Sequence, residues 1–459
     1  MCTTATELLP DAPEAPSAPP AAERSLAAEP RAAAPALRHR LWRFLFGSSM
    51  LALVDQALVS GTNFVVGVMV ARFAGIYEMG VYTLSYTLLV MAANVHYSLV
   101  AAPYTFIANQ LPLSQRRALA GSALLQHFVI TLVVIVLLLA AAGVAALCGA
   151  PAWVTTATLV VGIASPFVLL REMGRRCAFT DLRVFTVVLI DGAATVMTLG
   201  SLFWLGRTGQ LTGALSVLIV GAAGGIVGLV WLVVERHKFT WVRAQFRGDV
   251  DRTWAFGKWV LASQTASVTS AYITHWTLAA LLDAAATGAF AACQNVAQLA
   301  NPLLFGIANV LETKAAVAIA RGGHAELRRV VYDVTKWLVA TVGILAIAFV
   351  LFGEQAVRLL YGSAEPDLSV FVMPMLALTM VCNAFNVGLI HSLRVAQRSD
   401  VNVKADVLCC VVTLAVLLVD RANAGVLVGT FAMFAGGLCG LALRYWGYRL
   451  VVHSAEVRS

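Results

Sequence analysis

Twelve apolar runs, separated by short polar segments, constrain the fold of this chain more than any other feature of its sequence. A helix needs about 20 apolar residues to cross a bilayer core of about 30 Å. Backbone groups in hydrocarbon must bond internally, and these runs are too long and too evenly apolar for barrel strands. We therefore expect an all-α polytopic membrane protein with about twelve transmembrane helices. The runs cover residues 47–70, 80–108, 120–147, 152–170, 184–205, 211–234, 257–281, 287–311, 333–353, 368–391, 405–420 and 424–447.

The composition excludes several other classes of protein. Hydrophobic residues make up 60% of the 459 positions and charged residues only 12%, about half the charged fraction of a typical soluble domain. The net charge of +8 does not indicate a nucleic-acid partner, because the basic residues form short clusters between apolar runs. Short loops leave no room for a catalytic domain, so we expect no enzyme activity. The eight cysteines show no CxxC pair, and we expect neither a metal site nor a cofactor.

The distribution of Lys and Arg predicts the orientation. All 32 of them lie on one side of the predicted topology except Arg72, Arg207, Arg358 and Arg421. This asymmetry predicts a multi-pass protein of the bacterial inner membrane with both termini in the cytoplasm. The predicted domains are a disordered Ala/Pro-rich cytoplasmic tail (1–40), a six-helix bundle (41–234), a basic cytoplasmic connector (235–256), a second six-helix bundle (257–447) and a cytoplasmic tail (448–459).

An internal repeat relates the two bundles. At one constant offset along the chain, matching residues occur in the pairs Gln56 and Gln264, Ala71 and Ala279, Gly80 and Gly288, and Tyr82 and Phe290. Because each half has an even number of spans, the two halves share one orientation. This arrangement is typical of transporters whose halves rock about a central site. We therefore expect two six-helix repeats around a central cavity.

The stretch from Asp55 to Tyr86 resembles the opening of polysaccharide-biosynthesis flippases. These proteins form the Wzx-like polysaccharide transporter family of the multidrug/oligosaccharidyl-lipid/polysaccharide exporter superfamily. The resemblance implies a cavity lined by the first, second, seventh and eighth spans, and flipping of undecaprenyl-pyrophosphate-linked oligosaccharides by alternating access. The elements that carry it are Ser60, Asn63, the Ala71-Arg72 pair, Glu78, Gly80 and Tyr82.

Polar residues inside the spans are the candidate site, because such groups should face a cavity or a partner. The alternative is that they only join helices through hydrogen bonds. Pro302 should kink the eighth span, whereas Pro103 either kinks the second span or marks a helix boundary. The candidates for the substrate cavity are Gln56, Ser60, Asn63, Tyr86, Gln264, Ser267, His275, Gln294 and Gln298.

Charged residues are candidates for two further roles. Asp55 and Asp191 lie deepest in predicted spans and are candidates for ion coupling, the alternative being a pairing with a neighbouring helix. Anions favour Arg or Lys partners, and the candidates near the central spans are Arg72, Lys258 and Lys314.

The predicted function is a transporter that flips lipid-linked oligosaccharide or polysaccharide precursor across the inner membrane for cell-surface polysaccharide biosynthesis. Its expected partners are the lipid-linked sugar substrate, membrane lipids and the polysaccharide assembly machinery. A cation-coupled multidrug antiporter of the same superfamily is the main alternative. Lipid scrambling or a scaffold role is a third.

Overall fold

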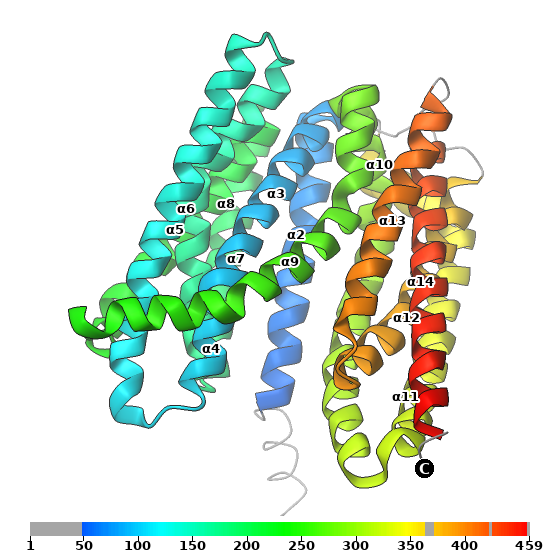
Figure 1. The fold of residues 1–459 in the computed structure, drawn as a ribbon. Coiled ribbons are helices and arrows are strands. Elements are labelled where there is room, and N and C mark those ends of the chain that lie inside the picture. The colour runs from blue at the N-terminus through cyan, green and yellow to red at the C-terminus, as the bar shows by residue number, and fades with distance from the viewer. Residues whose placement is uncertain (1–47, 363–370, 422–424, 457–459) are drawn as a thin grey trace, which may run out of the picture. The chain divides into compact units, whose positions relative to one another are not determined.

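The computed structural model describes residues 48–362, 371–421 and 425–456. By internal contacts the chain divides into Met1–Leu45 and Phe46–Ser459, and the described residues all belong to the second unit. The predicted disordered tail at 1–40 therefore lies outside the described residues. Within the described ranges every regular element is a helix, as Figure 1 shows. The predicted all-helical fold is confirmed.

The helices follow the order of the predicted spans. The first half of the described chain contains α2 (Ser48–Ala74), α3 (Ile76–His96), η1 (Tyr97–Ala101), α4 (Ala102–Ala108), α5 (Leu113–Leu147), α6 (Ala152–Thr180), α7 (Val184–Arg207), α8 (Gly213–Glu235) and η2 (Arg236–Lys238). The second half contains α9 (Arg243–Leu281), α10 (Ala284–Ala297), η3 (Gln298–Ala300), α11 (Asn301–Tyr361), α12 (Val372–Val395), α13 (Ser399–Val419) and α14 (Val426–Glu456).

Ten helical segments in the described ranges are long and apolar enough to cross a membrane. The two predicted spans outside that set are the seventh (257–281), within α9, and the eighth (287–311), which runs through α10, η3 and the start of α11. Both carry polar side chains on the face that lines the cavity described below. These two spans are therefore less apolar because their polar side chains line the candidate site.

Several helices extend beyond the predicted runs. The fourth run was predicted to end at 170, but α6 continues to Thr180, so Arg171, Arg175 and Arg176 lie in a helix and not in a loop. The connector predicted at 235–256 is helical from Arg243 onward. Helical structure in α11 continues through the loop predicted between 311 and 333 (Figure 1). The apolar runs predicted where the spans lie. They did not predict where the helices end, because these helices continue into polar sequence.

The two halves meet where α3 packs against α10. At Gly80 an added Cβ would lie 1.7 Å from the carbonyl oxygen of Ala284, and at Gly288 it would lie 2.0 Å from the carbonyl oxygen of Ile76. Gly80 and Gly288 are equivalent in the repeat, and so are Ile76 and Ala284. The contact is therefore reciprocal, with each glycine seated on the backbone of the other half. Only a residue without a side chain permits so close an approach.

The apolar core is shared between the halves. Its largest cluster joins buried residues of the first half, such as Val66, Val70 and Leu202, to buried residues of the second half, such as Ala292, Leu338 and Leu376. The α3–α10 contact lies beside this cluster, because Met79 and Ala291 also belong to it. The junction is a packed interface, and polar groups within it need hydrogen-bond partners.

The α3–α10 contact predicts that one methyl group added at either glycine strongly lowers the stability of the protein. Gly80→Ala or Gly288→Ala should destabilise the protein by about 1 to 3 kcal/mol, the usual range for overpacking. Gly143→Ala is the matched control, because nothing lies within 4 Å of a Cβ at that helical position. Thermal unfolding of the purified protein measures both. A loss of stability as large in Gly143→Ala as in Gly80→Ala would contradict the close contact.

Candidate functional site

A cavity of about 380 Å³ lies between the two halves. Its walls come from α2, α3, α9, α10 and the start of α11. These are the first, second, seventh and eighth predicted spans, the set that the family resemblance implied. We call it the central cavity. Amide, hydroxyl and aromatic side chains dominate its polar lining, and none of the described residues that form it is Asp, Glu, Lys or Arg.

Seven of the nine residues proposed for a substrate cavity line the central cavity. They are Gln56, Ser60, Asn63, Tyr86, His275, Gln294 and Gln298. Gln56 donates a hydrogen bond to the Ser60 hydroxyl at 3.3 Å. The Tyr82 ring stacks on the Tyr86 ring with centroids 5.9 Å apart. The structure thus brings together polar residues from four spans, and their role in binding a substrate stays a prediction.

Asn295 joins the halves at the edge of the central cavity. Its amide nitrogen donates to the Phe64 carbonyl of α2 and to the Tyr361 hydroxyl of α11, each at 3.1 Å. A Cβ at Gly67 would lie only 2.7 Å from that nitrogen. The hydrogen bonds satisfy a polar group within a packed interface. Asn295 therefore ties α10 to both α2 and α11.

Gln264 and Ser267 do not line the central cavity. Gln264 lines a second cavity of about 330 Å³, together with His96, Tyr97, Glu172 and Arg176. Gln264 and His275 share a face of α9 but lie about 16 Å apart along the helix, at 1.5 Å per residue. Ser267 is exposed on α9. Helical spacing placed Gln264, Ser267 and His275 on one face of α9, but it did not separate positions along that face.

Two of the spans that form the central cavity change their helical form next to a proline. The second span passes from α3 into the π-turn η1, and Pro103 then lies in the first turn of α4. The eighth passes from α10 into the 3-10 turn η3, and Pro302 then lies in the first turn of α11. The regular α-helix of the eighth span is therefore interrupted directly before Pro302, while a kink at that proline stays a prediction. Such irregular turns are frequent at functional sites and hinges.

A buried ion-pair network joins α2, α6 and α7. The Arg175 guanidinium lies 3.2 Å from the Asp55 carboxylate, 2.7 Å from Asp191 and 3.0 Å from Glu172. Arg171 lies 3.2 Å from Asp191. The Asp55 and Asp191 side chains are only 5% and 1% exposed. Both carboxylates therefore pair with a neighbouring helix, which is the alternative to ion coupling considered above.

The fold is similar to solved structures of membrane transporters. The inward-facing conformation of a multidrug resistance MATE family transporter of the MOP superfamily aligns with a TM-score of 0.70 at 15% identity, covering 88% of this chain and 96% of that chain. An outward-facing conformation of such a transporter aligns with a TM-score of 0.63 at 12% identity, covering 89% and 95%. A eukaryotic MATE transporter aligns with a TM-score of 0.61 at 12% identity, covering 92% and 99%.

The chain has the MATE transporter fold. No protein-family model and no curated protein matches the sequence. The predicted superfamily fits the fold, as does the two-repeat architecture, whereas the polysaccharide branch stays a prediction. The protein is a multi-pass membrane protein with the helix arrangement of MATE transporters.

Within this MATE fold, the arginines of α6 are the residues that sequence reasoning missed. Arg175 and Arg171 lie in the ion-pair network, and the Arg176 guanidinium stacks on the Tyr97 ring at 4.6 Å from its centroid. The sequence nevertheless contained a pattern that places these arginines in a helix. Leu169, Met173 and Cys177 are buried at intervals of four residues, the helical spacing that should have extended the fourth span past 170.

The residues proposed to bind an anion lie outside the central cavity of the MATE fold. Arg72 is exposed and donates to the Leu359 carbonyl at 3.4 Å. Lys258 is exposed, with its ammonium 5.7 Å from the centre of the Trp259 ring. The side chain of Lys314 lies outside the described residues. Arg176 is instead a basic residue that lines the second cavity.

Removal of Arg175 should strongly lower the stability of the protein, because three carboxylates would lose their shared partner. For Arg175→Gln we expect a loss of about 3 to 5 kcal/mol, the usual result of breaking a buried pair. Arg358→Gln, which breaks an exposed pair with Glu354, should cost less than about 1 kcal/mol. Unfolding of the purified variants compares them. Similar losses in the two variants would show that the α6 network does not hold the first half together.

Proposed function

We propose that the protein is a membrane transporter that moves an organic substrate by alternating access. One observation carries this proposal: a polar cavity lies at the junction of two repeat-related halves in a chain with the MATE fold. The proposed moving units are the predicted bundles at 41–234 and 257–447, and the α3–α10 contact is the pivot between them. We place the protein in a bacterial inner membrane with cytoplasmic termini, as the basic residues predict.

The lining of the central cavity supports recognition by neutral hydrogen bonds and aromatic contacts. Gln56, Asn63 and Gln298 each offer an amide with donors and an acceptor. His275 is 2% exposed, and its Nδ1 has no hydrogen-bond partner among the described residues. An unsatisfied buried donor or acceptor costs about 1 to 3 kcal/mol. A substrate that hydrogen-bonds there would remove this penalty.

Export of drug-like organic molecules is the first candidate for the substrate class. Two of the solved structures of similar fold are of a multidrug resistance MATE family transporter, and this supports the same class of function here. Tyr82, Tyr86 and Tyr272 line the central cavity, and aromatic faces attract organic cations. Coupling to a proton or sodium ion through Asp55 would require the ion to compete with Arg175.

Flipping of a lipid-linked oligosaccharide is the second candidate. A sugar presents many hydroxyl groups, and the amides and hydroxyls of the central cavity match that pattern. The uncharged lining supports contact with the sugar rather than with the pyrophosphate. Arg176 in the second cavity is then the candidate partner for an anionic group.

Transport in proteoliposomes tests the proposal and separates the two candidates. One arm uses a fluorescent organic cation with an imposed proton or sodium gradient, and the other uses a labelled undecaprenyl-linked oligosaccharide. Gln56→Ala/Gln298→Ala should slow transport of the true substrate by about tenfold for each hydrogen bond lost. Gln355→Ala, at an exposed glutamine far along α11, is the control and should not change the rate.

The outcomes are distinct. Cation movement that depends on a gradient and is slowed by the cavity variant would support drug export. Leaflet exchange of the oligosaccharide with the same sensitivity would support flipping. If protein-dependent movement of both probes is absent, or if the cavity variant and the control behave alike, the central cavity is not the transport site for either class.

A further inference from the structure

A larger cavity opens on the second half, away from the central cavity. Its volume is about 1050 Å³, and α11, α12 and α14 form its walls. We call it the α11–α14 groove. Its apolar part includes Phe385 and Leu389 of α12 and Leu438 of α14. It does not belong to the proposed transport path, because none of its lining residues lines the central cavity.

The groove ends in basic and aromatic side chains. Arg328 of α11 and Arg449 of α14 both line it, as do Tyr332, Tyr445 and Trp446. The Arg449 guanidinium lies 5.4 Å from the centre of the Tyr445 ring. Tyr332, Tyr445 and Trp446 are 66%, 51% and 60% exposed. Tyr and Trp favour the boundary between hydrocarbon and headgroups, so this end of the groove is suited to headgroup depth.

The charge of the groove distinguishes between lipid classes. Arg328 and Arg449 lie on the side that the basic loops predict to be cytoplasmic. Among the described residues that line the groove, none is Asp or Glu, although Asp333 is exposed elsewhere on α11. Basic pockets between transmembrane helices on this side of a membrane bind anionic headgroups. A zwitterionic headgroup would gain less from two guanidinium groups.

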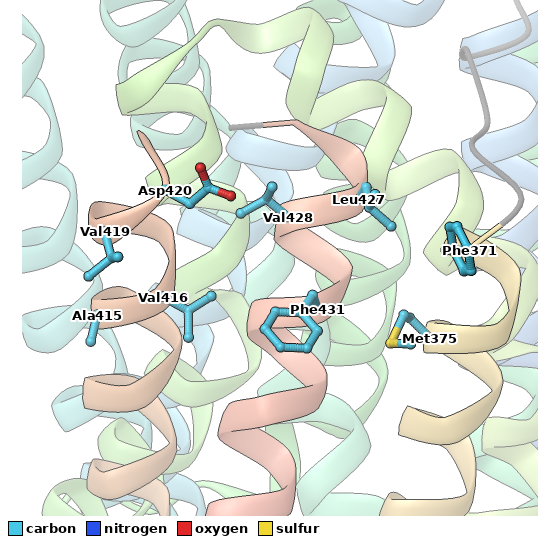
Figure 2. Close-up of a pocket in the computed structure, with 9 residues that line it drawn as sticks. All are labelled: Phe371, Met375, Ala415, Val416, Val419, Asp420, Leu427, Val428 and Phe431. Atoms are coloured by element: carbon cyan, nitrogen blue, oxygen red, sulfur yellow. The ribbon is translucent and has the colours of Figure 1, made fainter. Parts of the chain in front are cut away.

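A second external cleft provides an internal comparison. It has a volume of about 650 Å³ and lies near the opposite end of α14, between α12, α13 and α14. Figure 2 shows Phe371, Met375 and Phe431 around it, with the Asp420 carboxylate at its edge. This cleft is also apolar, but its charged group is an acid. Both clefts lie on the outside of the helix bundle, and they differ in the sign of their charged groups.

We propose that the α11–α14 groove is a binding site for an anionic phospholipid of the cytoplasmic leaflet. The acyl chains lie along Phe385, Leu389 and Leu438, and the phosphate lies between Arg328 and Arg449. The lipid would join the 328–335 part of α11 to the C-terminal end of α14. It therefore holds together the helices of the second half independently of which substrate is transported.

Lipid binding to the full-length protein tests this site. The purified protein is titrated with phosphatidylglycerol and, separately, with phosphatidylcholine, and bound lipid is counted by native mass spectrometry. The wild type should retain phosphatidylglycerol preferentially. Arg328→Gln/Arg449→Gln should weaken its binding by about 30-fold, which corresponds to the usual contribution of two basic residues near a membrane surface.

The control variant is Arg329→Gln/Lys336→Gln. It removes the same charge from exposed positions of α11 that do not line the groove, and it should leave the affinity unchanged. A Trp446→Phe variant should also lose part of the fluorescence quenching caused by brominated phosphatidylglycerol. Equal affinity for the two lipids, or an equal loss in both double variants, would overturn the proposal. Displacement of the bound lipid by lipid-linked pyrophosphate at lower concentration would also overturn it, since the groove would then serve the substrate.

Discussion

The backbone contact between Gly80 and Gly288 is the constraint on which the rest of the structure depends. It lets α3 and α10 approach so closely that a carbonyl oxygen of each half occupies the space of a side chain on the other. Because the contact is reciprocal, a rotation of one half relative to the other at this point must move both α3 and α10. The central cavity lies beside this contact, and its walls include the same two helices. The packing that joins the halves therefore also positions the candidate site.

Charge and hydrogen bonding are divided between different parts of the molecule. The central cavity has neutral polar walls, whereas Asp55, Asp191 and Arg175 form a buried network within the first half. Replacing a buried network by apolar residues is often neutral for stability, but removing one member is costly. This arrangement gives the first half a rigid polar centre on α6. A transport cycle that uses Asp55 must rearrange the pairing with Arg175.

Much of the fold follows from the sequence, because hydrophobic length and helix geometry act locally. The apolar runs indicate the spans, and the equivalence of Gly80 and Gly288 indicates the repeat. Polar residues such as Gln56 and His275 were placed together because each had to avoid lipid. The depth of Gln264 along α9 was not predictable, because periodicity gives the face of a helix and not the position of a cavity along it. Arg175 was missed for another reason: a charge inside a helix depends on partners in distant segments, here Asp55 and Asp191.

Side-specific labelling of the central cavity is the most direct test of alternating access. Asn63 lines that cavity and is exposed within it. Asn63→Cys would be studied in sealed vesicles after replacement of the eight native cysteines. If the protein works by alternating access, a membrane-impermeant maleimide reacts from both sides of the membrane, and transported substrate or an imposed ion gradient changes the ratio of the two rates. Labelling from one side only, under every gradient and with every substrate tested, would contradict alternating access.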